Sequence, residues 1–510
     1  MSIKKLIKNS SFSIGDKFIS ALVQLISIPI LLTVYGKESF GLIALAASLN
    51  VFLAILNFGL PMGFPKFVAE WIACTKSDKL YSVSGTILTF YILIGVISFV
   101  SLLILAFEFI SIFSVSPGQI PTLRDLLVVT AVTSLFAMPA NYLDQVLIGA
   151  QDLWFVSLTQ VAKNSIFLLL IVFIYFVPDA VSLIWFYILQ NIINFSMIFF
   201  KVRRWRLFGS YRIFQPQLHL RSTVPVLKYC LALMTFSIFI LLDNASKPLI
   251  LGILGENASE QVADFQIISI FRVFLMLLAA SLMQGLVPYL SQQRVFFGDA
   301  IFRKIITQGT KFIWAIGALV GGLLILESKQ IVMLYAGEKS LYLAPLINVY
   351  VLATMYNLYV TGIAAAVLSS GKVGPMVWAT GAGFVVSTVI SLALVRSLQL
   401  EAIVYSLVGY NIIHFLVMHF YYLPTQFGIA PLGQLTKIAF PPVIAVVVMH
   451  WLVVEVITLL ALQNIYLEML VGCSLGSAIY FAIIGSIYIR PREARELFNK
   501  LMTTKRGLVV

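Results

Sequence analysis

We single out eight ionisable side chains that lie inside, or near the ends of, stretches of sequence that are otherwise apolar. They are Asp16, Lys17, Asp144, Lys163, Lys228, Asp243, Lys247 and Arg272. A charge at the centre of a bilayer costs about 2.5–3.5 kcal/mol or more, so such residues face a cavity or a partner charge. We therefore take these eight residues as the candidate site of the chain, where a polar or charged substrate would bind.

Lys163 and Arg272 are the two cations placed deepest in these stretches. Each lies about ten residues from a stretch end, which is close to the bilayer midplane at 1.5 Å per residue. An arginine suits bidentate contact with a phosphate, and a lysine supplies a point charge. The sharper hypothesis is an anion site for a diphosphate or an acidic sugar. The alternative is that each cation binds a carboxylate or a carbonyl and holds helices together.

Asp243 and Lys247 are four residues apart, so on a helix they share one face and can form an ion pair. The pair is either a structural lock or a gate that opens when substrate or a cation competes for one member. Asp16, Lys17, Asp144 and Lys228 lie nearer the ends of their stretches. They either contact substrate or extend to water at the membrane interface.

The chain lacks the motifs that an enzyme of this size would be expected to carry. It contains no G-x-x-x-x-G-K-[ST] phosphate loop, no D-x-D pair and no Ser/His/Asp cluster in an external domain. Cys74, Cys230 and Cys473 lack metal-site spacing, and His414 and His419 are five residues apart, which does not bring them together for a metal. We predict no catalytic residue, no metal and no cofactor, but a secondary transporter whose coupling ion would be H⁺ or Na⁺.

The amino-acid composition indicates which kind of secondary structure carries these charged residues. Of the 510 residues, 60% are hydrophobic and only 11% charged, with a mean hydropathy of +1.00. Soluble domains average about 25% charged residues, and a globule this apolar could not cover its surface with polar groups. The sequence therefore predicts an all-α polytopic membrane protein.

A membrane-spanning helix needs about 20 mostly apolar residues, and this length predicts fourteen spans. They cover 11–35, 40–61, 82–107, 124–149, 153–177, 180–200, 225–254, 262–290, 306–327, 343–369, 373–396, 400–422, 436–460 and 465–489. With a cytoplasmic N-terminus, the inner loops and tails hold 24 Lys and Arg residues and the outer loops hold 5. This bias predicts a multi-pass protein with both termini in the cytoplasm. It also accounts for the net charge of +13 without nucleic acid as a partner.

A weak internal repeat divides the chain. Val34-Tyr35-Gly36, Gly59-Leu60 and Val146-Leu147-Ile148 have counterparts in Ile253-Leu254-Gly255, Gly285-Leu286 and Val367-Leu368-Ser369, at separations of 219 to 226 residues. Because six spans are an even number, the repeats enter the membrane in the same sense. The predicted parts are an N-terminal lobe at 1–200, a basic linker at 201–222, a C-terminal lobe at 223–422, two further spans in 423–489, and a basic tail at 490–510.

Four segments and one single residue resemble bacterial polysaccharide flippases of the multidrug/oligosaccharidyl-lipid/polysaccharide exporter superfamily. They are Val34 to Leu42 (VYGKESFGL), Asn57-Phe58-Gly59-Leu60, Tyr142 to Asp152 (YLDQVLIGAQD), Asp243, and Leu286 to Ser291 (LVPYLS). The family usually has an aspartate where this chain has Asn57. The resemblance covers spans one to twelve by order and spacing.

The resemblance implies two six-helix lobes around a central cavity, with spans thirteen and fourteen appended. The implied function is to flip an undecaprenyl-diphosphate-linked oligosaccharide across the bacterial inner membrane, by alternating access. The product would be a surface polysaccharide such as the O-antigen of lipopolysaccharide, a capsule or an exopolysaccharide. Implied partners are the polyprenyl-diphosphate-linked glycan, membrane lipids, and assembly proteins such as a polysaccharide polymerase.

Two other transport functions stay open: a cation-coupled exporter of small organic molecules, and a flippase for a peptidoglycan lipid precursor. A drug exporter favours carboxylates in its cavity, whereas Lys163, Lys247 and Arg272 favour an anionic cargo. A membrane polymerase or ligase would be expected to carry a large external loop, and no predicted outer loop exceeds about twenty residues, the length of a single span.

Overall fold

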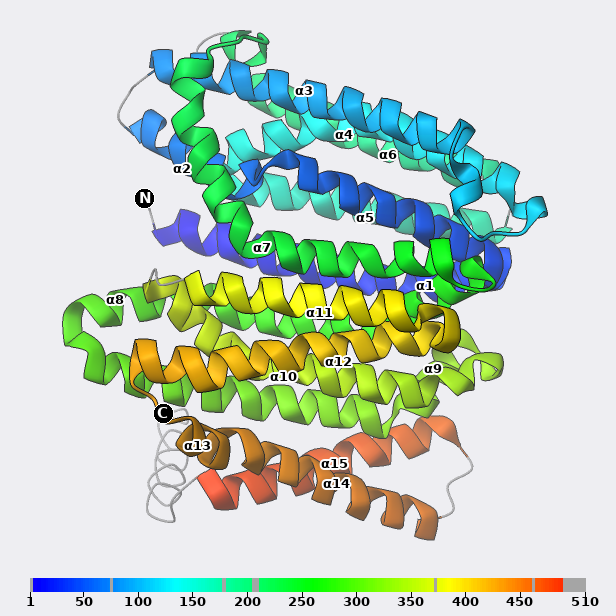
Figure 1. The fold of residues 1–510 in the computed structure, drawn as a ribbon, viewed down its shortest axis with the longest axis vertical. Coiled ribbons are helices and arrows are strands. Elements are labelled where there is room, and N and C mark those ends of the chain that lie inside the picture. Colours follow the sequence, from blue (N-terminus) through cyan, green and yellow to red (C-terminus); the bar gives the residue numbers. More distant parts are fainter. Residues whose placement is uncertain are drawn as a thin grey trace, which may run out of the picture. The chain divides into compact units, whose positions relative to one another are not determined.

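The computed structural model describes residues 3–73, 77–176, 180–203, 211–370, 374–460 and 464–488. All regular secondary structure in these ranges is helical (Figure 1). The α-helices are α1 (Ile3–Leu53), α2 (Leu60–Ala73), α3 (Ser77–Phe107), α4 (Ile120–Gly149), α5 (Leu153–Phe176), α6 (Ala180–Arg203), α7 (Leu220–Leu254), α8 (Ala258–Leu326), α9 (Ser328–Ala336), α10 (Ala344–Ser370), α11 (Gly374–Leu398), α12 (Leu400–Leu416), α13 (Pro431–Gln434), α14 (Phe440–Leu460) and α15 (Ile465–Tyr488).

Ten helical segments within the described residues are long and apolar enough to cross a membrane. They are Leu22–Leu49, Asp78–Phe107, Pro117–Gly149, Leu153–Phe173, Ile306–Leu326, Glu338–Ala364, Gly374–Leu398, Leu400–Phe427, Pro431–Leu460 and Ile465–Tyr488. The chain is therefore a multi-pass helical membrane protein, as predicted. Predicted spans six, seven and eight fall in α6, α7 and α8 but are not among the ten, so the count of fourteen stays a prediction.

Predicted spans one and two both lie in α1, which is interrupted at Gly36. This residue has φ 75° and ψ 169°, a backbone conformation that residues other than glycine rarely adopt. Two helices therefore meet at a kink at Gly36, where the sequence places the turn between the two spans. The helix α8 covers the positions of predicted spans eight and nine over 69 residues.

The helices form two compact units. Unit 1 comprises Met1–Val273 and Met376–His414, and unit 2 comprises Phe274–Pro375 and Phe415–Val510. The predicted lobes at 1–200 and 223–422 and the linker at 201–222 stay a prediction. The units group helices by their packing in one conformation, whereas the lobes are defined by repeat order along the chain.

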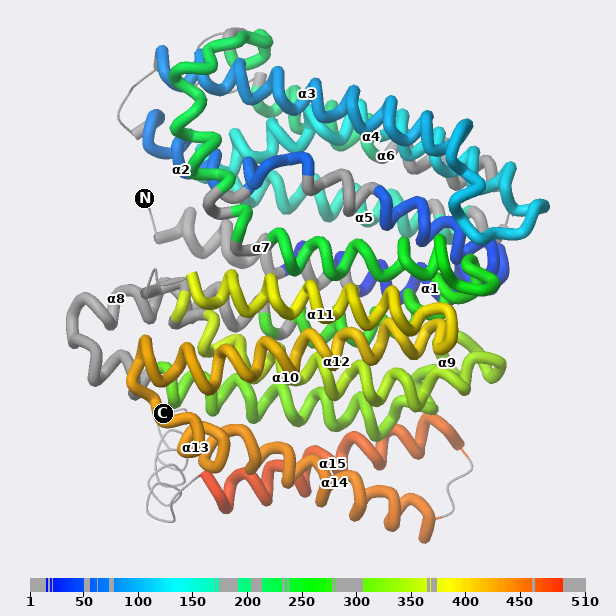
Figure 2. The backbone as a smooth tube through the Cα atoms, viewed as in Figure 1, coloured from blue at the N-terminus to red at the C-terminus, as the bar shows by residue number. Residues whose placement is uncertain are grey.

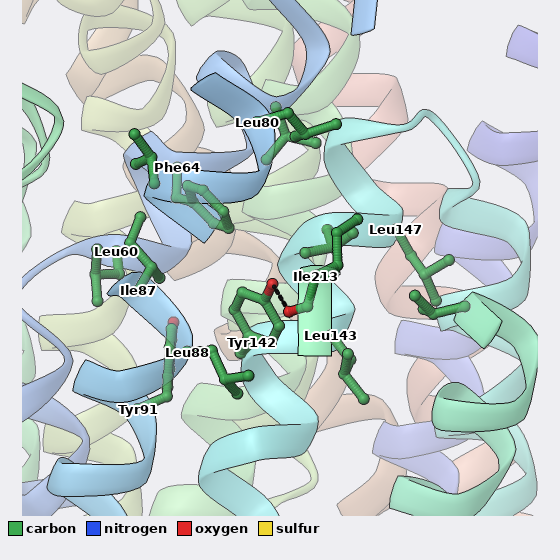
Figure 3. Packing of buried hydrophobic residues seen from close by; sticks show 14 of the residues in the cluster. Leu60, Phe64, Leu80, Ile87, Leu88, Tyr91, Tyr142, Leu143, Leu147 and Ile213 are labelled. Atoms are coloured by element: carbon green, nitrogen blue, oxygen red, sulfur yellow. Dashed lines mark hydrogen bonds between the residues drawn. The ribbon is translucent and has the colours of Figure 1, made fainter. Parts of the chain in front are cut away.

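In unit 1, α4 lies between α3 and α6, and α1 packs against α5 and α7 (Figure 1). A core of buried aliphatic and aromatic side chains joins α2, α3 and α4 (Figure 3). At its centre the hydroxyl of Tyr142 donates a hydrogen bond to the carbonyl oxygen of Ile213 at 3.0 Å. Ile213 belongs to the 3₁₀ turn η5 (Tyr211–Phe214), so this bond holds the segment before α7 on the core.

In unit 2, α14 and α15 run side by side (Figure 2). Gly317 and Gly321 of α8 face Leu358 and Met355 of α10, where an added Cβ would meet side-chain atoms at 3.0 Å or less. Two π-helical segments, η7 (Val417–Phe427) and η8 (Leu435–Ala439), join α12 to α14 through the short α13. Small residues on α8 thus let helices approach closely, as is usual where lipid gives no hydrophobic drive to association.

Candidate functional site

Asp243 and Lys247 form the ion pair that their spacing predicts. Lys247 Nζ lies 3.0 Å from Asp243 Oδ1 on α7, and each residue is 3% exposed. The same ammonium donates hydrogen bonds to the hydroxyls of Ser387 and Ser391 on α11, the second at 3.2 Å. Three oxygen atoms from two helices therefore surround one buried cation.

Arg272 and Tyr410 complete this group, which we call the α7 cluster (Asp243, Lys247, Arg272, Ser387, Ser391 and Tyr410). Arg272, on α8, is half-buried and close enough for its charge to act on Lys247. The phenol of Tyr410, on α12, is buried within the fields of Asp243 and Arg272. The cluster thus brings the charged side chains of Asp243, Lys247 and Arg272 together with hydroxyl groups from α11 and α12.

A second group, the α5 cluster, consists of Asp16, Ser20, Asp144, Lys163 and Asn164. Asp144 of α4 is 7% exposed, and opposite charges couple it to Lys163 of α5. The neighbouring Asn164 donates a hydrogen bond to Ser20 Oγ at 2.6 Å, and Ser20 in turn donates to Asp16 Oδ1 at 3.5 Å. Through Lys163 and the adjacent Asn164, α5 thus interacts with a carboxylate of α4 and with a hydroxyl of α1 within unit 1.

Of the eight predicted residues, six therefore lie in these two clusters. Lys228 is exposed on α7 and belongs to neither cluster. Lys17 lies on α1, but its side chain is outside the part of the chain that the structure describes. The substrate contacts proposed for all eight residues stay predictions.

Ser387, Ser391 and Tyr410 are not among the residues predicted from the sequence. The two serines are four residues apart on an apolar helix, and this spacing indicates that they share a face. The ion pair between Lys37, directly after Gly36 in α1, and Asp264, near the start of α8, was not predicted either; Lys37 Nζ lies 2.8 Å from Asp264 Oδ1. Neither partner shows in the local sequence, because the contact joins residues far apart in the chain.

Unit 2 contains a cavity of about 680 Å³. Its walls come from α8, α10, η8 and α14 and from Phe415, and they are almost wholly aliphatic and aromatic. Leu352 and Tyr356 of α10 and Val443, Val447 and Val454 of α14 are among the lining residues. A cavity of this composition fits a hydrocarbon chain and offers little to a charged group.

The fold resembles solved structures of membrane transporters and flippases. A structure described as the lipid II flippase MurJ in an inward closed conformation aligns with a TM-score of 0.71 at 13% identity, covering 96% of this chain and 99% of that chain. An inward-facing multidrug resistance transporter of the MATE family, from the MOP superfamily, aligns with a TM-score of 0.61 at 16% identity, over 78% of this chain and 92% of that chain. The MATE multidrug transporter DinF-BH gives a TM-score of 0.62 at 16% identity, with 83% and 96% covered.

No protein-family model matches the sequence, and a comparison with curated proteins finds no match. At these identities the structural likeness shows the fold: this chain has the fold shared by MurJ and the MATE transporters of the MOP superfamily. The alignment with the flippase spans nearly the whole chain, whereas those with the two multidrug transporters leave out about a fifth of it.

Proposed function

We propose that this chain is a flippase that moves a polyprenyl-diphosphate-linked oligosaccharide across the bacterial cytoplasmic membrane by alternating access. The observation that carries the proposal is the apolar cavity of unit 2, which has the volume and lining expected for part of a lipid chain. A small hydrophilic cargo would need no such cavity. One wall is α14, which belongs to the appended pair of predicted spans.

The clusters of unit 1 have side chains suited to a polar head group. The diphosphate is an anion, and the α7 cluster contains the cations Lys247 and Arg272. Hydroxyl-rich sugars suit the serine, asparagine and tyrosine side chains that accompany the charges. In this proposal the product serves surface polysaccharide assembly, the coupling ion is H⁺ or Na⁺, and a polysaccharide polymerase acts next.

A peptidoglycan lipid precursor is the second candidate substrate. It is supported by the alignment with the lipid II flippase, which covers 96% of this chain. Both candidates are lipid-linked glycans, so the cavity does not separate them. A cation-coupled exporter of small organic molecules has weaker support, because the two multidrug transporters align over 78% and 83% of the chain.

A deletion strain tests the function. If the main proposal holds, the strain loses a surface polysaccharide and accumulates its lipid-linked repeat units on the inner side. Unchanged polysaccharide together with accumulated peptidoglycan precursor would favour the second candidate. Neither change, with increased sensitivity to organic cations, would contradict both.

A cavity-filling variant links the function to the structure. Val447 is 62% exposed on the cavity wall, so Val447→Trp should fold but fill the space meant for the lipid. We expect at least a tenfold lower export in the complemented strain at native protein level, because the lipid must leave or distort the site, at a cost of about 1.4 kcal/mol per tenfold. Leu470→Trp, at a 64% exposed position of α15 outside the cavity, is the matched control. Equal export by both variants would remove the cavity from the proposal.

A further inference from the structure

Glu327 is a buried acid at the corner between α8 and α9. It directly follows the apolar segment Ile306–Leu326 and is 1% exposed. Neither of its carboxyl oxygens accepts a hydrogen bond from any residue that the structure describes. An ionised carboxylate in such a place lacks both water and protein donors, which makes its charge very costly.

The corner packs against α15. A Cβ atom at position 472 would overlap Glu327 Oε1, so Gly472 makes the room for the carboxyl group. Glu468, one turn earlier on α15, is near enough for its negative charge to act on Glu327. The amide of Gln330 faces Glu468, to whose Oε1 it donates a hydrogen bond at 2.8 Å, while its own Oε1 is buried without a donor among the described residues.

No neighbouring group that the structure describes offsets the charge of Glu327. On α15 another titratable neighbour is the thiol of Cys473, which has no positively charged form. Lys329 on α9 and Glu455 on α14 are both exposed. Glu327 also precedes the first turn of α9, but its side chain makes no capping hydrogen bond there.

We propose that Glu327 binds a proton, and that this neutral carboxyl group is what allows α15 to pack on the corner of α8 and α9. The ligand is a proton rather than a metal ion, since no group of three or more His, Cys, Asp or Glu residues suited to a metal occurs in the described chain. As an acid, Glu327 gains an O–H donor in a region where the buried oxygen of Gln330 lacks one. Burial and the charge of Glu468 are consistent with this, since they raise the pKa of Glu327 from 4.5 to about 7.

The sign of the pH dependence follows from the raised pKa. Between about pH 4.5 and 7 the folded chain holds a proton at Glu327 that the unfolded chain has released. This group therefore makes folding less favourable as the pH rises through that window, by about tenfold in the unfolding constant per pH unit. Above about pH 7 its contribution no longer changes.

The test uses the full-length chain in lipid nanodiscs and needs no substrate, so its outcome is independent of the transport function. Infrared difference spectra between the native chain and Glu327→Gln, recorded at pH 6, should show a protonated carboxyl band that the variant lacks. In the native chain this band should disappear with a midpoint near pH 7. The thermal stability of Glu327→Gln relative to the native chain should increase from about pH 4.5 and level off near pH 7.

Two further variants separate the possible outcomes. Glu468→Gln should lower the midpoint, because it removes one of the two causes of the raised pKa, and Glu455→Gln should leave it unchanged. If no protonated carboxyl band is lost in Glu327→Gln, the proposal is wrong. A midpoint that moves with the concentration of Na⁺ or Ca²⁺ would instead identify a metal ion as the ligand and overturn the proton assignment.

Discussion

At the scale of single residues, the α7 cluster is distinguished by a cation that is fully surrounded. Lys247 contacts Asp243 on its own helix and two serine hydroxyls on α11. Removing either charge would leave the other buried and uncompensated, which costs about 3–5 kcal/mol. A single substitution therefore cannot separate a loss of folding from a loss of function. The double variant, in which both residues are neutral, can separate the two.

We predict that Asp243→Asn/Lys247→Gln recovers the protein level of the native chain but not its export. No buried charge is left uncompensated in this variant, whereas any competition of substrate or coupling ion for the pair is lost. Membrane protein level and lipid-linked export are the two measurements, and Arg396→Gln, an exposed cation at the end of α11, is the control. Full export from the double variant would reduce the pair to a structural lock.

The sequence was most informative where the contact is local. The Asp243–Lys247 pair follows from helix geometry alone, and Gly36 marks the break between two predicted spans. The partners Ser387 and Ser391 lie 140 and 144 residues beyond Lys247, and local periodicity carries no information about packing over such separations. In the α5 cluster, Asp16, Asp144 and Lys163 could each be predicted from the sequence, but their partners on other helices could not.

At the scale of helices, glycine residues allow the backbones of two helices to come into direct contact. Gly41 of α1 lies so near the start of α8 that a Cβ atom there would overlap the backbone of Ser259. The Lys37–Asp264 ion pair joins the same two helices. One steric contact and one charged contact therefore hold this end of α1 against α8.

We expect Gly41→Ala to destabilise unit 1 by about 1–3 kcal/mol, because backbone atoms cannot move aside as a flexible side chain can. Thermal unfolding in detergent, followed by intrinsic fluorescence, measures the effect. Gly118→Ala is the matched control, since nothing lies within 4 Å of a Cβ added there. A variant as stable as this control would mean that α1 and α8 do not approach so closely in the membrane.

At the scale of the whole molecule, the predicted topology distributes charge by side of the membrane. The predicted inner loops and tails hold 24 basic residues and the predicted outer loops hold 5, and this bias predicts the orientation. Asp243, Lys247 and Arg272 lie outside the ten apolar segments found among the described residues, whereas Asp144 and Lys163 lie inside two of them. Hydropathy alone therefore does not identify which helices hold the charges.

Reporter fusions test this orientation directly. We predict cytoplasmic activity for fusions after residues 210 and 505, and external activity for fusions after 258 and 337. The fusion at 337 follows α9, the helix that begins beside Glu327, so it also places that acid on the outer side. One reproducible reversal among the four would contradict the fourteen-span topology or its orientation.

The three oxygen atoms that bind the Lys247 ammonium, from Asp243, Ser387 and Ser391, determine how this site responds to salt. A diffusible cation would occupy these oxygen atoms in proportion to its concentration, whereas the covalently attached ammonium has an effective local concentration that dilution does not change. Low salt or chelators therefore cannot remove the cation from this site. Only a displacement of α11 relative to α7, which withdraws the hydroxyls of Ser387 and Ser391, can expose the cation to another anion.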